Sequence, residues 1–392
     1  YWNTGEFYYE YIKILFTVDN IGIVNDDIER LSQEITGYQI PYVAPILFEL
    51  PLVALTKFFN INNSKEVYEL CHLANFLIFF VSLIAFFKFV QTNQKSIIYS
   101  IIAVTMLFLS PRFFAESFYN SRDIFFLSLF IFYLHALQNF IHQQNFKTSL
   151  YLSFTSSLLI YAKIVGIIPV VLFFFIYYLN SLNKKNNNKN EIKFILFIIL
   201  MSMLFIYILW PYLWLDPLNN LIHSFKWSVE MQNDISILNF YFGEYILSNN
   251  VSWHYRIVWF LITTPVIIVL FFLVGFFLLL KQIIEGFMKI KLSTDDPWKN
   301  LDEMINQYLF FILISILFIT IKFDTSQFGS WRHIYFLYPI VILFSLFGIR
   351  FITSLFKDKK YKNVIFSLFI LNFIYIIHWN YLNHPHQQVF FN

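Results

Sequence analysis

Two adjacent carboxylates near the start of the chain have the residue types for acid–base chemistry. Asp26 and Asp27 follow the apolar run 22–24 and Asn25. A carboxylate beside apolar residues can serve as a general base, because a less polar environment shifts its pKa. A solvated acidic turn that caps the next helix would have the same composition, since Asp is a favourable N-cap residue. The pair alone leaves both interpretations open.

A second motif concentrates charged side chains between two apolar segments. It runs over 110–123 and contains Arg112, Glu116, Arg122 and Asp123. Ionisable groups at membrane depth are costly unless they are paired or used. Arginine can bind a phosphate through two parallel hydrogen bonds, which favours a functional interpretation. The competing interpretation is a structural Arg–Asp pair that closes a helical hairpin, above all for Arg122 and Asp123.

Two further segments place basic groups beside apolar or aromatic residues. Lys163 stands alone between two short apolar segments, where it could reach the membrane surface or bind a lipid phosphate. The segment 329–335 contains Arg332, His333 and Tyr335 and opens a predicted helix. Basic side chains beside aromatic rings suit an anionic, amphiphilic ligand. An aromatic belt with a basic anchor at the membrane surface would show the same pattern.

The elements that must position these residues are membrane helices. Of the 392 residues, 58% are hydrophobic and 13% are charged, about half the charged share of a soluble domain. Apolar runs of about 17–25 residues are long enough to cross a bilayer. We expect helices near 72–90, 97–110, 124–140, 149–162, 164–180, 194–213, 255–280, 307–321, 335–353 and 363–379. The sequence therefore predicts an all-α polytopic bundle with about ten transmembrane spans, and it excludes a soluble domain.

The loops between these helices form two alternating sets. One set is short and lysine-rich; the other is longer, acidic and aromatic, at 18–71, 111–123, 214–254, 322–334 and 380–392. The lysine-rich side holds 16 Lys and Arg against 7 Asp and Glu, and the other side 11 against 17. By the positive-inside rule, the lysine-rich loops are cytoplasmic. We expect a multi-pass protein of the inner (plasma) membrane with its chemistry on the extracytoplasmic side, and short amphipathic helices on that surface.

Several function classes lack their sequence signatures. The single cysteine, Cys71, excludes a disulfide framework and a Cys-based metal site. The chain has no glycine-rich nucleotide loop, no HExxH and no Gly-x-Ser-x-Gly. Of nine histidines only His384 and His386 lie close together, so we predict no metal site and no cofactor. We also expect no nucleic-acid partner.

Taken together, the segments resemble the GT-C class of membrane glycosyltransferases. The resemblance is to family 39, the group of protein O-mannosyltransferases and lipid A aminoarabinose transferases, in its bacterial form with an uncharacterised substrate. It covers almost the whole chain and rests on the order and spacing of individually weak motifs. These are Asp26-Asp27 after Gly22-Ile23, the motif 110–124, Lys163 before Gly166, and the segments 210–214, 253–255, 263–265, 331–335 and 384–387. Asp27 departs from the family, where the second acid is often Glu.

The resemblance implies an inverting transfer of a sugar from a polyprenyl-phosphate carrier to a lipid, glycan or protein acceptor at the outer face. It implies that Asp26 is the general base, with Asp27 close behind, and that Asp123 is a further catalytic acid position. It places the carrier phosphate near basic residues, and the substrate site as a whole at Arg112, Glu116, Arg122, Lys163, Arg332, His333 and Tyr335.

The resemblance also implies the organisation of the chain. Residues 1–392 form a single GT-C-like domain, in which 18–71 is the first outer, catalytic loop and 214–254 another outer loop. We expect a further membrane span ahead of Tyr1 that is not part of this sequence.

Three other functions fit parts of the pattern. A flippase or transporter for lipid-linked glycans predicts a central hydrophilic cavity between pseudo-symmetric halves, whereas no internal repeat is visible and the polar residues gather at the outer helix ends. A polymerase or ligase for a surface polysaccharide differs only in its acceptor. A non-catalytic scaffold predicts that the acids of the first loop point into solvent, away from Lys163 and Arg332.

Overall fold

The structure of the chain, a computed structural model, describes residues 2–17, 46–183, 188–214, 216–234, 236–289, 298, 300–322 and 327–392. Asp26 and Asp27, and most of the predicted catalytic loop 18–71, lie outside these ranges. The described chain is almost wholly helical and contains one two-stranded antiparallel hairpin. The prediction of an all-α protein is therefore confirmed.

Each apolar segment predicted to be helical lies mostly on an α-helix, although the predicted helix 194–213 ends early, at Leu209, before the 3₁₀ turn Pro211–Leu213. In chain order these are α4 (Ser64–Gln94), α5 (Ile97–Leu109), α7 (Asp123–His142), α8 (Phe146–Ala162), α9 (Ile167–Asn183), α10 (Asn188–Leu209), α12 (Tyr255–Thr263) with α13 (Val266–Lys289), α14 (Leu301–Lys322), α15 (Tyr338–Leu355) and α16 (Lys359–Leu382). The predicted helix 255–280 is broken in two at Thr264 and Pro265. Proline lacks the N–H that would continue the helix, and it pushes the residue before it into an extended conformation.

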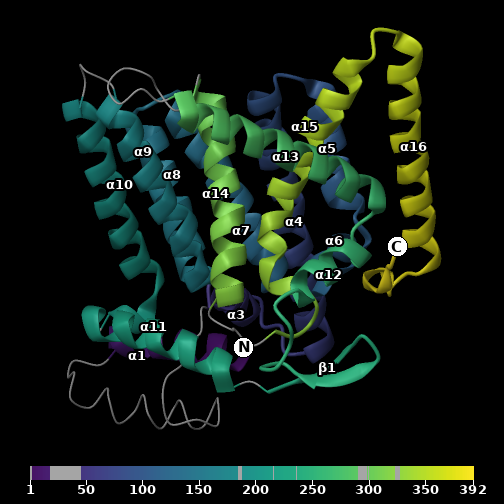
Figure 1. Cartoon of the computed structure of the whole chain (residues 1–392). Helices are drawn as coiled ribbons and strands as arrows, with labels where there is room; N and C mark the ends of the chain where they lie inside the picture. The colour runs from purple at the N-terminus through teal and green to yellow at the C-terminus, as the bar shows by residue number, and fades with distance from the viewer. Residues whose placement is uncertain are drawn as a thin grey trace.

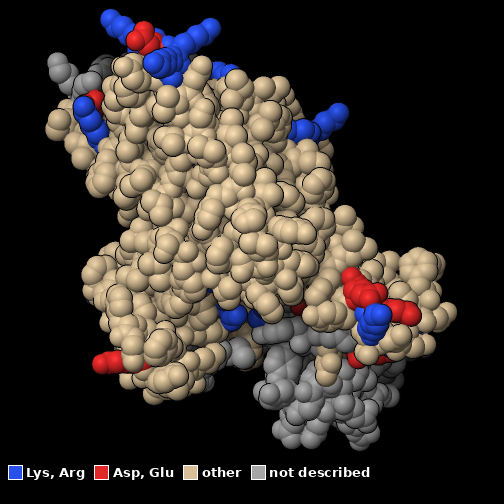
Figure 2. All heavy atoms as spheres, turned by 90° about the vertical axis from the view of Figure 1, so that its right-hand side faces the viewer, with Lys and Arg blue, Asp and Glu red and all other residues tan. Residues whose placement is uncertain are grey.

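The bundle has the dimensions and composition of a multi-pass membrane protein. Within the described ranges, seven helices are long and apolar enough to cross a bilayer. The number is eight if α5 and α6 (Pro111–Tyr119), which meet at an angle of 63°, form one bent span. Figure 2 shows mostly Lys and Arg, with a few acidic atoms, at one end of the molecule, charged atoms of both signs at the other end, and a broad belt between them that is almost free of charge. Such a belt suits the hydrocarbon core of a bilayer.

Short elements gather at the end of the bundle opposite the lysine-rich loops (Figure 1). They are α1 (Trp2–Thr17), α3 (Glu49–Phe58), α11 (Pro217–Asp234), β1 (Leu238–Tyr241) and β2 (Glu244–Leu247). Helices α1 and α11 lie across the end of the bundle (Figure 1). Part of the predicted outer loop 214–254 is thus a β-hairpin, whose turn uses Phe242 and Gly243 with φ of 51° and 88°.

The crossing of α13 and α15 fixes the C-terminal half of the bundle. Gly275 and Gly348 face each other there. A Cβ at Gly275 would lie 1.8 Å from the carbonyl oxygen of Phe344, and one at Gly348 would lie 2.1 Å from that of Phe271. Small residues allow such close approach, which is how membrane helices gain packing contacts without a hydrophobic driving force. The crossing holds the N-terminal end of α15, which directly follows the 3₁₀ helix that contains Arg332 and Tyr335.

Candidate functional site

The residues of the charged motif 110–123 are placed by a sharp turn and an aromatic cluster. The chain bends between α5 and α6, where Pro111 begins α6 at a position that tolerates proline. The ring of Phe113 on α6 packs against Trp331 at 5.7 Å and Tyr338 at 4.4 Å between ring centroids. This contact fixes α6 against the short 3₁₀ helix Arg332–Leu337 that leads into α15. The polar side chains beside Phe113 on α6 thereby meet residues more than two hundred positions later in the chain.

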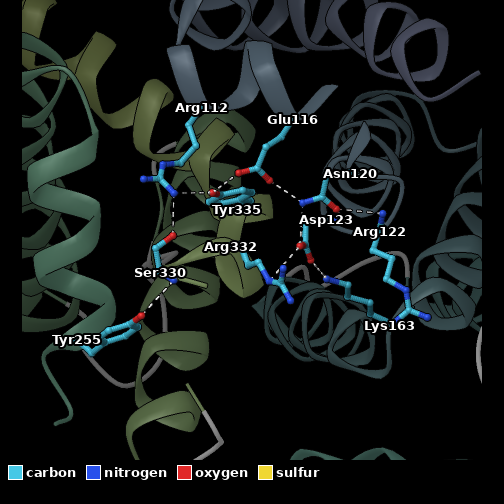
Figure 3. A network of polar contacts seen from close by, with 10 residues as sticks. All are labelled: Arg112, Glu116, Asn120, Arg122, Asp123, Lys163, Tyr255, Ser330, Arg332 and Tyr335. Carbon is cyan, nitrogen blue, oxygen red and sulfur yellow. Dashed lines mark hydrogen bonds and ion pairs between the residues drawn. The ribbon is translucent and has the colours of Figure 1, made fainter. Parts of the chain in front are cut away.

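Arg112 and Glu116 lie on either side of the phenol of Tyr335 (Figure 3). The Arg112 Nη1 donates hydrogen bonds to Ser330 Oγ at 2.9 Å and to the Tyr335 hydroxyl at 3.4 Å. The Tyr335 hydroxyl donates to Glu116 Oε1 at 2.8 Å. Both charged side chains are buried, with 8% of Arg112 and 7% of Glu116 exposed. The two opposite charges are thus held close together without a direct ion pair.

Asp123 gathers two cations at the start of α7. It accepts a hydrogen bond from Lys163 Nζ at 2.5 Å, and its other oxygen lies 3.8 Å from Arg332 Nε. Asp123 is itself buried. A buried carboxylate between two cations is stabilised in its charged form and holds both cations in place. The competing interpretation of a local Arg122–Asp123 pair does not describe this geometry, because the cations on Asp123 come from two other segments of the chain.

Asn120 connects the two carboxylates. Its Nδ2 donates to Glu116 Oε2 at 2.6 Å and to Asp123 Oδ2 at 3.1 Å. Its Oδ1 accepts from the backbone N–H of Asp123 at 2.9 Å and of Arg122 at 3.3 Å. The Asn120 side chain therefore accepts hydrogen bonds from backbone N–H groups of the turn between α6 and α7, and it holds both carboxylates in place (Figure 3).

Lys163 reaches Asp123 because α8 ends in a tight turn. Lys163 is extended, with φ of −152° and ψ of 134°, and Gly166 follows in a short 3₁₀ turn. A Cβ at Gly166 would lie 2.4 Å from the carbonyl oxygen of Leu159, so only glycine permits this packing. The Lys163 ammonium also lies 5.3 Å from the ring centroid of Phe126. The structure pairs the Lys163 ammonium with Asp123, a contact that neither interpretation of Lys163 predicted.

A cavity of about 770 Å³ opens beside this network. Three arginines line it, namely Arg112, Arg122 and Arg332, together with the carboxyls of Glu49 and Glu116. Aromatic side chains form much of the remaining wall, among them Phe48, Phe240, Tyr255 and Trp259. Its size and its mixture of apolar wall and few polar groups are typical of sites for organic ligands. The surplus of arginine over carboxylate favours an anionic group.

The structure brings seven of the residues predicted for the substrate and catalytic site into one network. They are Arg112, Glu116, Arg122, Asp123, Lys163, Arg332 and Tyr335 (Figure 3). His333 lies on the same 3₁₀ helix, with its ring 4.7 Å from that of Phe328, and does not line the cavity. The positions of Asp26 and Asp27 are outside the described residues.

Sequence reasoning missed several residues of the site. Ser330 has φ of 64° after Gly329, also with φ of 64°, and this left-handed turn presents its hydroxyl to Arg112. Its backbone N–H donates to the Tyr255 hydroxyl at 3.2 Å, which links α12 to the network. The Gly-Ser pair was a signal for such a turn. Glu49, at the start of a short helix, gave no signal beyond that of an acidic first turn.

Comparison of the chain with known protein families, characterised proteins and solved structures found no match. In the described part of the chain, no group of three or more His, Cys, Asp or Glu side chains could hold a metal ion.

Proposed function

We propose that the protein is a membrane glycosyltransferase of the GT-C type, which transfers a sugar from a polyprenyl-phosphate carrier to an acceptor at the outer membrane surface. The observation that carries the proposal is the cavity at one end of an apolar bundle, lined by three arginines and by aromatic side chains. A lipid phosphate bearing a sugar has the matching chemistry, since it combines an anion, a polar ring and a long apolar chain.

The leaving group of such a transfer is a lipid phosphate, whose negative charge must be stabilised as its bond to the sugar breaks. Arg112 is suited to this task because it is buried, is fixed by Ser330 and Tyr335, and makes no direct ion pair with Glu116. Preorganised cations in a site shielded from water act strongly on developing charge. Arg122 and Arg332 line the same cavity and would add to the positive potential.

The acceptor hydroxyl must lose a proton as its oxygen attacks the anomeric carbon. In this step the new C–O bond forms, the bond between the anomeric carbon and the phosphate oxygen breaks with its electrons going to the phosphate, and the proton goes to a carboxylate. Such a base contributes about 10²–10⁴-fold, and Asp26 and Asp27 are our candidates. Asp123 contacts Lys163 and Arg332 through its two oxygens, so we assign to it the positioning of these cations.

The membrane side follows from the charge of the loops. The cavity is lined by residues of α3, α6, α12 and β1. These elements lie at the end of the bundle opposite the lysine-rich loops (Figure 1). If those loops are cytoplasmic, the site faces the extracytoplasmic side of the inner membrane. A lipid-linked sugar donor, which moves within the membrane, explains why a transferase would be built from membrane helices.

The test is sugar transfer by the purified protein in nanodiscs, with a panel of radiolabelled polyprenyl-phosphate sugars. Wild type is compared with Arg112→Ala, Asp26→Asn and Asp27→Asn, and with the control Lys360→Ala, which alters an exposed cation at the opposite end. We expect carrier-dependent release in wild type and in the control, about a 10²-fold loss in Arg112→Ala, and a loss in whichever Asn variant removes the base.

Release that is unchanged in Arg112→Ala would contradict the phosphate site. Movement of the carrier across proteoliposomes without sugar release would replace the transferase with a flippase. Transfer to a growing polysaccharide chain would identify a polymerase or ligase.

A further inference from the structure

Glu49 is a buried carboxyl in the cavity wall whose hydrogen-bond donor within the described chain is its own backbone N–H. It begins α3, only 8% of it is exposed, and it lines the cavity. No other residue of the described chain donates a hydrogen bond to its carboxyl or forms an ion pair with it. The charge that acts most strongly on it is that of Arg122, which also lines the cavity. Buried carboxylates are normally paired or hydrogen-bonded, so this position needs an explanation.

The packing around α3 holds Glu49 toward the cavity. On one side, Phe48 packs edge-on against Phe125 of α7, with ring centroids 5.3 Å apart. On the other side, Gly5 of α1 lies so close that a Cβ there would be 3.0 Å from the Cβ of Glu49. The backbone of Glu49 is thus clamped between two helices.

The other carboxyl of the cavity wall differs from Glu49 in this respect. Each oxygen of Glu116 already accepts a hydrogen bond, one from Tyr335 and one from Asn120 (Figure 3). The hydrogen bonds within the network therefore account for the burial of the Glu116 carboxyl. Glu49 is the acidic group of the described cavity wall that a bound molecule would have to satisfy.

The charges of the cavity restrict what that molecule presents to Glu49. A second anion is excluded at this carboxyl by like-charge repulsion. A cation would face three arginines across the same cavity, which disfavours it. A neutral hydroxyl can donate a hydrogen bond to a carboxylate, and such a bond to a charged group is stronger than one between neutral groups.

We propose that Glu49 binds a hydroxyl group of a carbohydrate, and so determines which sugar or acceptor the site takes. The inference rests on the proposed function and adds the contact by which the sugar-like part of the substrate is recognised. The hydroxyl belongs either to the sugar on the carrier or to the acceptor, and the two sources are separated by measurement.

The experiment compares the binding of two lipids to the full protein in nanodiscs: bare polyprenyl phosphate and the same lipid carrying a hexose. The variants are Glu49→Ala, Glu49→Gln, which keeps a hydrogen-bond acceptor, and the control Glu69→Ala, an exposed acid on α4. If the hydroxyl is on the donor, wild type should bind the hexosyl lipid more tightly than the bare lipid. Glu49→Ala should lose about tenfold or more of that preference. Glu49→Gln should lose less, and bare-lipid binding should not change.

If the hydroxyl is on the acceptor, the lipid preference stays as in wild type. Glu49→Ala then raises the KM for the acceptor about tenfold, with a smaller change in the KM for the donor. An unchanged lipid preference together with an unchanged acceptor KM overturns the inference while leaving the phosphate site intact. Failure of wild type to bind bare polyprenyl phosphate overturns the proposed function, and the inference with it.

Discussion

Arg112 and Glu116 lie one turn apart on α6, yet the hydroxyl of Tyr335 stands between them and no direct ion pair forms. Opposite charges at this spacing on a helix ordinarily attract each other. Here the Arg112 guanidinium is held toward Ser330 and the cavity, while Glu116 is held by Tyr335 and Asn120. The phenol therefore keeps a buried arginine available for an external anion.

The first prediction concerns this phenol. In Tyr335→Phe, the hydroxyl that separates the two charges is lost, so Arg112 and Glu116 are free to pair directly. Pairing would neutralise Arg112, and we expect the affinity for polyprenyl phosphate to fall about three- to tenfold. Equilibrium binding in nanodiscs measures this, with Tyr375→Phe on the exposed face of α16 as the control. Equal affinities in the two variants would show that the Tyr335 hydroxyl does not affect how strongly Arg112 binds the phosphate.

The second prediction concerns the stability that Asp123 provides. In Asp123→Asn, Lys163 and Arg332 lose their common counter-charge. Breaking a fully buried pair costs about 3–5 kcal/mol, but both cations reach solvent in part, so we expect a loss of about 1–3 kcal/mol in the free energy of unfolding. Chemical denaturation in detergent micelles measures it.

The control for Asp123 is Asp302→Asn at the other end of the bundle. Asp302 lies 3.2 Å from Lys95, a largely exposed side chain, and 3.3 Å from His142, which carries a charge only when protonated. Ion pairs to exposed lysines contribute about 0–1 kcal/mol. Equal losses in the two variants would mean that Asp123 is no more than another surface acid.

The third prediction is a pH dependence at Glu49. Burial raises the pKa of the Glu49 carboxyl above its ordinary value of 4.5, and the hydrogen bond from its own backbone N–H and the positive charge of Arg122 offset only part of this effect. Below the ordinary pKa, Glu49 is neutral in the folded and the unfolded protein, and its burial carries no charge penalty. As the pH rises through the raised pKa, the folded state must hold a buried charge, and stability is lost.

Glu49→Gln cannot ionise, so it should be more stable than wild type at pH 7, and the difference should vanish as the pH falls below 4.5. Thermal unfolding across this pH range measures the difference. A variant that is more stable and also loses carbohydrate binding would mean that the carboxyl is kept for its function. A constant difference at all pH values would contradict a titrating Glu49.

Local sequence patterns predict where the helices lie. They do not predict the contacts between residues far apart in the chain, which depend on how the helices pack. Hydropathy located the apolar helices because length and composition are local properties. Pro265 carried the signal for the break between α12 and α13, but the long apolar run concealed it. The contact between Arg112 and Ser330 joins residues 218 positions apart, and no spacing rule predicts it.

The charged residues of the site were predictable for a different reason. An arginine or an acid within apolar sequence is costly, so Arg112, Asp123 and Lys163 stood out without any knowledge of their partners. Glu49 did not stand out, because an acid at the start of a short helix is ordinary. That no other residue of the described chain pairs with its carboxyl is a property of the folded chain alone.

The fourth prediction tests the helix crossing that supports the site. In Gly275→Ala, the new Cβ would overlap the backbone carbonyl of Phe344, which cannot move without shifting α15. We expect a loss of about 3 kcal/mol or more in the free energy of unfolding, at the upper end of overpacking effects. Phe277→Ala, with 61% of the side chain exposed, is the control and should change stability by about 0.5 kcal/mol or less. A tolerated alanine at position 275 would contradict the close crossing.

The fifth prediction uses the single cysteine of the sequence as a probe of the cavity. Cys71 on α4 is half-buried and lines the cavity near Glu49. A ligand in the cavity should therefore shield it. At a polyprenyl phosphate concentration ten times its Kd, about one protein in eleven is unoccupied, so labelling by a small neutral maleimide should slow about tenfold. The control is Leu73→Cys in a Cys71→Ser background, an exposed position on the same helix that does not line the cavity. Protection of Cys71 without protection of position 73 would place the carrier lipid in this cavity, and equal rates with and without lipid would place it elsewhere.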